Sequence, residues 1–125
     1  MANLPKSVSQ AWDEREGPCV FSTVDTHGTP NAIYVTSVSK YREDLLLIAN
    51  NFFNKTQANI LTGSRGSLLF ITKEGKSYQI KGALEYYSDG ELFDDMKKWN
   101  LTVLPGHGVA ALKVEHVFCG AERII

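Results

Sequence analysis

The sequence predicts a mainly β protein: a six-stranded antiparallel sheet that curls into a barrel, with short α-helices between the strands. Three observations support this fold class. Apolar and polar residues alternate with a period of two in most of the segments that lie between turn-forming residues. Helical periodicity is confined to three short stretches. A chain of 125 residues is also small for an open sheet, and closure into a barrel removes exposed sheet edges.

The chain is expected to form a single domain over residues 1–125, with an N-terminal helix in residues 1–17 and the barrel, with two further helices, in residues 18–125. Hydrophobic residues make up 43% of the chain and charged residues 22%, which is the balance of an ordinary globular protein. A domain of this size can bury enough apolar surface to form a core.

The first predicted element is a helix over residues 7–16. Ser7 and Gln10 have the spacing of a capping box, in which each side chain bonds to the other residue's backbone N–H. Gly17 and Pro18 then end the helix. Val8, Ala11, Trp12 and Arg15 are expected to lie on one face of this helix.

Residues 19–24 and 31–39 are expected to pair as a hairpin, because both alternate with a period of two. The connection between them, residues 25–29, contains the Asp and Gly that tight turns favour. Residues 45–50 form the third predicted strand. Its apolar run is continuous, so we expect both of its faces to be buried.

Three further strands complete the predicted sheet, over residues 67–73, 77–87 and 108–119. Gly82 interrupts the second of them, and a glycine within a strand indicates a bulge or a close approach of another backbone. A helical pattern that ends at Trp99 separates the last two strands.

Composition and charge argue against several classes of function. The formal net charge of −1 provides no field that attracts nucleic acid or an anionic membrane. No apolar run has the length of a membrane span, and the first residues lack the apolar core of a signal peptide, so we expect a cytoplasmic protein. The three histidines are scattered, and no metal site is expected. No acid–base or nucleophilic constellation is recognisable, so the catalytic residues stay unknown.

The segment after the third strand places a lysine and a threonine at the start of a short helix. Asn54 and Gln57 have capping-box spacing, which predicts that the helix begins at Lys55. A lysine there adds positive charge to a helix end that is already electropositive, and a bound phosphate would resolve this conflict. Thr56 adds a hydroxyl. The alternative interpretation is a solvated lysine on a surface helix.

Several motifs in this order resemble the pyridoxamine 5′-phosphate oxidase-like family of FMN-binding split β-barrels, and in particular its short FMN-binding proteins. They are the hairpin sequence GTPNAIYV (residues 28–35), a strand ending in small polar residues, Lys-Thr-x-x-Asn at residues 55–59, IKGALEYY (residues 80–87) and a helix ending in Trp99. The resemblance runs from about Gly17 to the end of the chain.

The resemblance implies a homodimer that binds one FMN in each of two clefts at the subunit interface. The phosphate would lie on Lys55 and Thr56, with Asn54 nearby, and Trp99 of the partner subunit would approach the flavin ring. The ring and the ribityl chain would lie against two segments: Ile33, Tyr34, Val35 and Thr36, and Ile48, Ala49, Asn50 and Asn51. The implied function is that of an oxidoreductase that passes electrons through flavin, with a reduced nicotinamide or another small molecule as donor.

The sequence departs from pyridoxamine 5′-phosphate oxidase itself, which is longer and binds its substrate's phosphate with basic residues late in the chain. Here the late basic residues are Lys113 and Arg123, so true vitamin B6 oxidase activity is not expected. Two other functions stay open: a non-enzymatic flavin carrier or electron-transfer protein, and a dimeric binding module without a cofactor. A deazaflavin in place of FMN is also compatible with the sequence.

Overall fold

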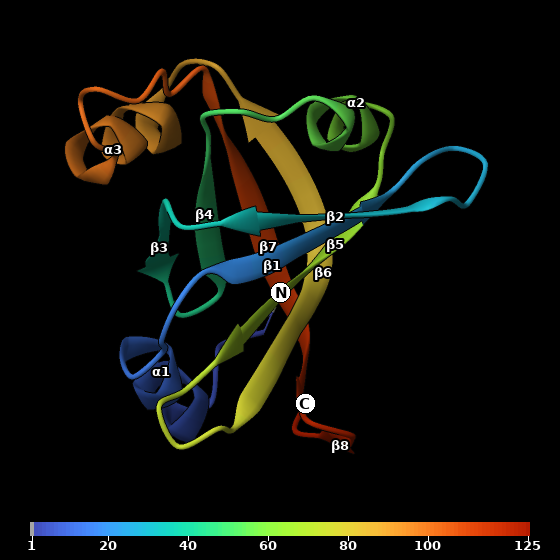
Figure 1. Cartoon of the computed structure of the whole chain (residues 1–125), viewed down its shortest axis with the longest axis vertical. Coiled ribbons are helices and arrows are strands. Elements are labelled where there is room, and N and C mark those ends of the chain that lie inside the picture. The colour runs from blue at the N-terminus through green and yellow to red at the C-terminus, as the bar shows by residue number, and fades with distance from the viewer. Residues whose placement is uncertain (1) are drawn as a thin grey trace.

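The structure, a computed structural model, describes residues 2–125. It contains one curled antiparallel sheet of eight strands and three short helices, so the mainly β prediction is confirmed (Figure 1). Among residues 2–125, no helix combines the length and the apolar character needed to cross a membrane. The elements are α1 Lys6–Asp13, β1 Cys19–Val24, β2 Pro30–Val35, β3 Val38–Arg42, β4 Leu45–Asn50, α2 Lys55–Leu61, β5 Arg65–Ile71, β6 Ser77–Tyr87, α3 Glu91–Trp99, β7 Gly108–Cys119 and β8 Glu122–Arg123.

The sheet curls because two strands that follow each other in sequence lie at its opposite edges. The strand order is β2-β1-β5-β6-β7-β4-β3, with β8 paired to β7. Only Thr36 and Ser37 separate β2 from β3, and so short a link spans less than about 11 Å. The two edges must therefore lie side by side, which turns the sheet into a half-barrel.

The prediction of six strands is wrong for two reasons. Residues 31–39 do not form one strand: the segment breaks at Thr36, and the part from Val38 pairs with β4 instead of β1. Alternation continues through the break, so the sequence pattern does not reveal it. The second reason is β8, whose two residues pair with Phe118 and Cys119 and are too few to give a periodic signal.

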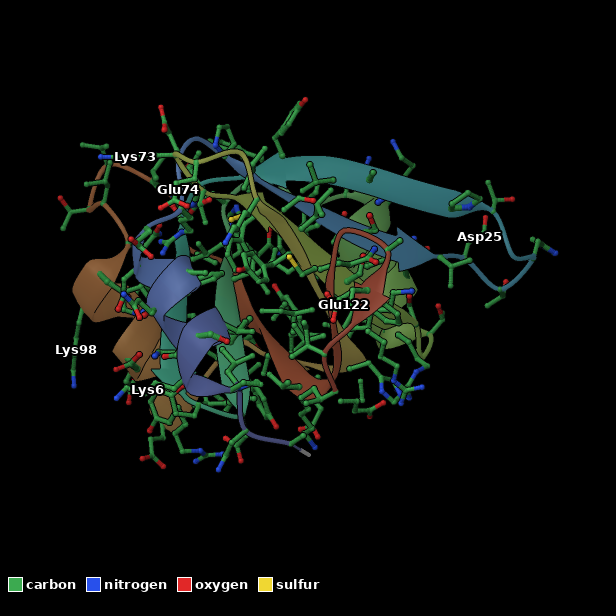
Figure 2. All side chains as sticks on the ribbon, turned by 90° about the horizontal axis from the view of Figure 1, so that it is seen from below. Lys6, Asp25, Lys73, Glu74, Lys98 and Glu122 are labelled. Carbon is green, nitrogen blue, oxygen red and sulfur yellow. The ribbon has the colours of Figure 1, made fainter. Side chains whose placement is uncertain are left out.

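The hairpin of β1 and β2 is confirmed, with Cys19 opposite Val35 and Val24 opposite Pro30. Asp25 organises its turn, since its Oδ1 accepts the backbone N–H groups of His27 and Thr29 at 2.9 Å each. These N–H groups, that of Thr29 above all, lower the pKa of the Asp25 carboxyl. Figure 2 shows the turn at Asp25 projecting beyond the rest of the sheet.

The N-terminal helix forms, but without the predicted capping box. It begins at Lys6 after Pro5, so Ser7 lies inside the first turn and no side chain caps the helix. Of the residues expected on one face, Val8, Ala11 and Trp12 are the buried residues of the helix. Arg15 lies beyond the helix end, where its guanidinium stacks 4.1 Å from the centre of the Trp12 ring.

Strand β4 is buried on both faces, as its apolar run predicts. Leu46 and Ile48 point into the main core inside the barrel, and α1 covers one end of this core. Leu45, Leu47 and Ala49 point outward into a second, smaller core beneath α3. Figure 1 places α1 at the opposite end of the sheet from α2 and α3.

Gly82 marks a bulge, as predicted. The register between β6 and β7 shifts between Lys81 and Gly82, and a Cβ atom at residue 82 would overlap the backbone carbonyl of Lys113. The glycine is therefore required for steric reasons, since backbone from the next strand occupies the place of a side chain.

We expect Gly82→Ala to lower the free energy of unfolding by about 2–4 kcal/mol, because the methyl group meets backbone that cannot move aside. Urea denaturation monitored by circular dichroism measures this loss. Gly66→Ala is the matched control: its Cβ would lie 2.6 Å from Leu84 Cδ1, the end of a flexible side chain. An equal or larger loss for Gly66→Ala would contradict the explanation.

Candidate functional site

A cleft of about 200 Å³ opens where the chain crosses from β2 to β3. Two features of its lining stand out: it contains no charged side chain, and it combines aliphatic and aromatic groups with a few hydroxyls and one amide. Such a lining suits a flat, largely apolar group that carries polar atoms at its edge. The lining residues are Ile33, Tyr34, Val35, Thr36, Ser37, Ala49, Asn51, Phe52, Phe53 and Leu104.

The crossover explains why two distant segments meet in this cleft. Once the chain has passed from β2 to β3, β3 pairs with β4, with Val38 opposite Ile48. The backbone N–H of Ala49 donates to the carbonyl oxygen of Ser37 at 2.9 Å, which fixes the link against the end of β4. The structure thus brings together Ile33, Tyr34, Val35, Thr36, Ala49 and Asn51 from the two predicted segments.

Ile48 and Asn50 belong to the predicted set, but their side chains do not line the cleft. Successive residues of a strand point to opposite faces, so both lie on the face of β4 away from Ala49. Ile48 is fully buried in the main core. The amide of Asn50 donates to Tyr86 Oη at 2.7 Å and to Gln57 Oε1 at 3.0 Å, and its oxygen accepts the backbone N–H of Phe53.

Asn51 is buried and holds the loop that closes the other side of the cleft. Asn51 and Asn100 bond through both amides, with N···O distances of 3.1 and 2.9 Å. The Asn51 oxygen also accepts the backbone N–H of Gly106 at 3.0 Å. These bonds tie the segment that carries Leu104 to the end of β4. Sequence reasoning missed Asn100 and Gly106, because no local pattern marks a contact across 49 positions.

Helix α2 begins at Lys55, as predicted, but the capping box does not form. The Asn54 side chain makes no cap bond, and the Gln57 side chain instead accepts the bond from Asn50. Lys55 is exposed, whereas Thr56 is buried and its hydroxyl oxygen accepts a bond from Asn31 Nδ2 at 3.0 Å. At the start of the helix, the Lys55 ammonium is therefore exposed to solvent, whereas the Thr56 hydroxyl is buried next to it in sequence.

A second amide group fastens α2 to the β1–β2 hairpin. Asn59 Nδ2 donates to Thr23 Oγ1 at 3.0 Å, and Asn31 bridges Thr23 and Thr56. Asn59 is the last residue of the Lys-Thr-x-x-Asn motif, and its side chain holds α2 against β1. Neither Thr23 nor Asn31 stands out in the sequence.

Trp99 lies at the end of α3, half-buried against the smaller core, and its Nε1 donates to Asp95 Oδ2 at 3.1 Å. It does not line the cleft of its own chain. Its approach to the ring of the partner subunit therefore stays a prediction. Within residues 2–125, no three His, Cys, Asp or Glu side chains gather closely enough to hold a metal ion.

Comparison with known proteins identifies the family. A family model described as pyridoxamine 5′-phosphate oxidase matches residues 7–118. An uncharacterized protein of Methanocaldococcus jannaschii is 31% identical over 109 residues, which cover 82% of this chain and 73% of that protein. The chain therefore belongs to the pyridoxamine 5′-phosphate oxidase-like family, in agreement with the resemblance seen in its motifs.

Solved structures confirm the split-barrel fold. HupZ of Group A Streptococcus superposes with a TM-score of 0.80 at 21% identity and covers 93% of both chains. An FMN-binding protein of Syntrophomonas wolfei gives 0.71 at 23% identity, over 81% of this chain and 75% of the other. At these identities the similarity establishes the fold alone.

Other structures with the same fold differ in the ligand or activity that their names give. An F420 reductase has a TM-score of 0.63 at 17% identity, over 91% of this chain and 98% of the other. A heme binding protein of Mycobacterium smegmatis has 0.71 at 14% identity, over 94% of this chain and 55% of the other. The fold by itself thus does not fix the ligand.

The amide pair at the cleft gives a prediction about stability. Asn51→Ala and Asn100→Ala are each expected to cost about 2–3 kcal/mol, because each leaves a buried amide without its partner. The double variant should cost little more than Asn51→Ala alone, since the Asn100 amide is then no longer orphaned and only the backbone N–H of Gly106 stays without its acceptor. Denaturant titrations of the three variants measure the coupling.

Asn54→Ala is the control for this comparison of the Asn51 and Asn100 single and double variants, since the exposed Asn54 side chain makes no cap bond. It should change stability by no more than about 0.5 kcal/mol. Strictly additive losses in the Asn51 and Asn100 cycle would show that the two amides do not act as a pair.

Proposed function

We propose that this protein binds FMN, with the flavin ring in the cleft between β2 and β4 and the phosphate at Lys55, and that it acts as an oxidoreductase. The observation that carries the proposal is the uncharged cleft itself, which six residues of the two expected ring-binding segments line. The phosphate end lies close by along the chain, because Lys55 follows two residues after Phe53 of the cleft wall.

The residues around the start of α2 suit a phosphate dianion. Lys55 supplies a positive charge that no carboxylate within residues 2–125 pairs with. The oxygen of Thr56 already accepts a bond from Asn31, so the hydroxyl proton remains for a phosphate oxygen. Charge-assisted bonds of this kind are stronger than neutral ones, and they would anchor the molecule by its phosphate.

When bound, FMN supplies the redox chemistry by accepting and passing on electrons. The residues of the cleft hold and orient the ring. Thr36 and Ser37 of the link are the residues whose remaining polar groups would face it, since the Asn51 amide is occupied by Ser37, Asn100 and Gly106. The apolar walls at Ile33 and Phe53 exclude water from one side.

We also propose that a second copy of the chain completes the site. A cleft of about 200 Å³ is smaller than the 300–1,000 Å³ or so that ligand sites usually offer. Two of its lining aromatic residues, Tyr34 and Phe52, are 79% and 81% exposed, and exposed aromatic side chains that gather at one cleft suit an interface. In such a homodimer, Trp99 of the partner subunit would close the cleft.

A second candidate function is that of a non-enzymatic flavin carrier or electron-transfer protein. It is favoured by the cleft lining, which holds no carboxylate, imidazole or ammonium group for proton transfer to a substrate. Vitamin B6 oxidase activity is not part of the proposal: of the late basic residues, Lys113 forms an ion pair with Glu85, and Arg123 lies on β8.

Lys55→Ala is expected to weaken FMN binding by about 1.5–3 kcal/mol, which is roughly 10- to 100-fold, and to leave riboflavin binding unchanged. Only FMN carries the phosphate, so the difference between the two ligands isolates its contact. Fluorescence titration of both flavins measures it, and Lys73→Ala, at an exposed lysine far along the chain, is the control. An equal loss of affinity for both flavins would show that the FMN phosphate does not bind at Lys55.

Reduction of the bound flavin distinguishes the two candidate functions. Anaerobic mixing of the FMN-loaded protein with NADH or NADPH should bleach the flavin absorbance near its visible maximum in a single rapid two-electron reduction if the protein is an oxidoreductase of this type. A flavin that only a protein partner reduces supports the carrier. A colourless protein that takes up neither FMN nor a deazaflavin would leave only a binding module.

A further inference from the structure

The outer face of the sheet carries a row of polar side chains that the flavin site does not use. Ser22 on β1 lies opposite Ser67 on β5, Ser67 opposite Lys81 on β6, and Lys81 opposite His116 on β7. Cross-strand partners share a face, so the four side chains form one line across four strands. We call these residues the β1–β7 row.

The row borders a hollow of about 330 Å³, which is within the size range of ligand sites. Gly66 and Gly82 contribute only backbone to its lining. The lining residues are Ser22, Thr23, Val24, Arg65, Gly66, Ser67, Gln79, Lys81, Gly82 and His116.

The row consists of hydrogen-bond donors. Arg123 Nη2 lies 3.1 Å from His116 Nδ1, and arginine can only donate, so Nδ1 accepts and the proton of a neutral ring is on Nε2. Lys81 has no carboxylate partner among residues 2–125. The carboxylate in contact with this group of cations is Glu115, which pairs with Arg65. The Lys81 ammonium lies 5.0 Å from the centre of the Phe118 ring, a contact that leaves its hydrogen-bond donors free, so Lys81, His116 and the two serine hydroxyls remain to bind an acceptor.

We propose that the β1–β7 row binds the diphosphate group of a small organic molecule. Neighbouring strands are about 4.8 Å apart, so the row extends for about 14 Å. A single phosphate reaches the donors of only two adjacent strands, whereas a diphosphate reaches those of three or more. Phosphate oxygens, several on each phosphorus and all of them acceptors, suit ammonium, imidazole and hydroxyl donors better than the two oxygens of a carboxylate do.

The position of the row relative to the cleft indicates where the remainder of the bound organic molecule would lie. Ser22 lies opposite Ala32 on β2, and a shallow hollow of about 210 Å³ lined by Val20, Ala32, Ile33 and Tyr34 continues from there. Ile33 and Tyr34 also line the proposed flavin cleft. A molecule held on the row by its diphosphate therefore extends toward the rim of that cleft.

The test is a titration of the full-length protein with inorganic pyrophosphate and inorganic phosphate, followed by ¹H–¹⁵N NMR. The proposal expects shifts concentrated at the backbone amides of Ser22, Ser67, Lys81 and His116, with pyrophosphate bound more tightly than phosphate. Lys81→Gln should weaken pyrophosphate about tenfold, the loss expected for one charge-assisted contact. The FMN affinity of this variant should stay unchanged.

Lys6→Gln is the matched control, because Lys6 is an exposed lysine on α1, and Figure 2 shows it well apart from Glu122 of β8. Equal weakening by Lys6→Gln and Lys81→Gln would reveal non-specific attraction and overturn the proposal. Shifts confined to Lys55 and Thr56 would also overturn it, since pyrophosphate would then occupy the proposed flavin phosphate site. Pyrophosphate binding at the row without any FMN binding would support the row and refute the proposed function alone.

Discussion

The two-residue link between β2 and β3 is the constraint on which the rest of the structure depends. Thr36 and Ser37 join strands at opposite edges of the same sheet. A flat sheet would hold these edges too far apart for a two-residue link, so the sheet must curl. The same link creates the cleft, because it sets the end of β2 beside the end of β4 and leaves a gap that neither strand fills. Fold and candidate site thus have one cause, and a change in the length of this link would alter both.

Several buried polar side chains lie at this end of the barrel, in place of the aliphatic groups that fill the main core. Asn50, Asn51 and Asn100 are all buried and all hydrogen-bonded through both amide atoms, and Thr56 and Asn59 are buried and hydrogen-bonded beneath α2. An unpaired buried amide is costly, so each of these bonds permits one arrangement of the backbone and penalises the others. The result is a cleft whose walls are fixed before any ligand arrives, which lowers the entropy lost on binding.

Membership of the family leaves the ligand open, because related structures carry names that include FMN, F420 and heme. Two local features bear on this choice in the proposed site: the uncharged cleft suits a flat ring, and Lys55 suits a phosphate, which FMN and a deazaflavin cofactor both carry. The β1–β7 row lies on the outer face, and its donors point to a second phosphate-bearing molecule. Strand β1, which carries Ser22 of the row, pairs with β2, which lines the cleft, so the two proposed sites lie on neighbouring strands.

The sequence by itself determined the mainly β fold, the buried strand β4, the bulge at Gly82 and the start of α2, because each depends on neighbours along the chain or on a residue with unique backbone freedom. Only the tertiary structure decided that the strand predicted over residues 31–39 breaks at Thr36, and that Asn50 and Gln57 bond to each other instead of serving the ligand or the helix cap. Alternation and capping patterns report local preference. Strand pairing across the barrel and hydrogen bonds to buried amides override that preference. Their partners lie far away in sequence, outside the short window in which a local pattern is read.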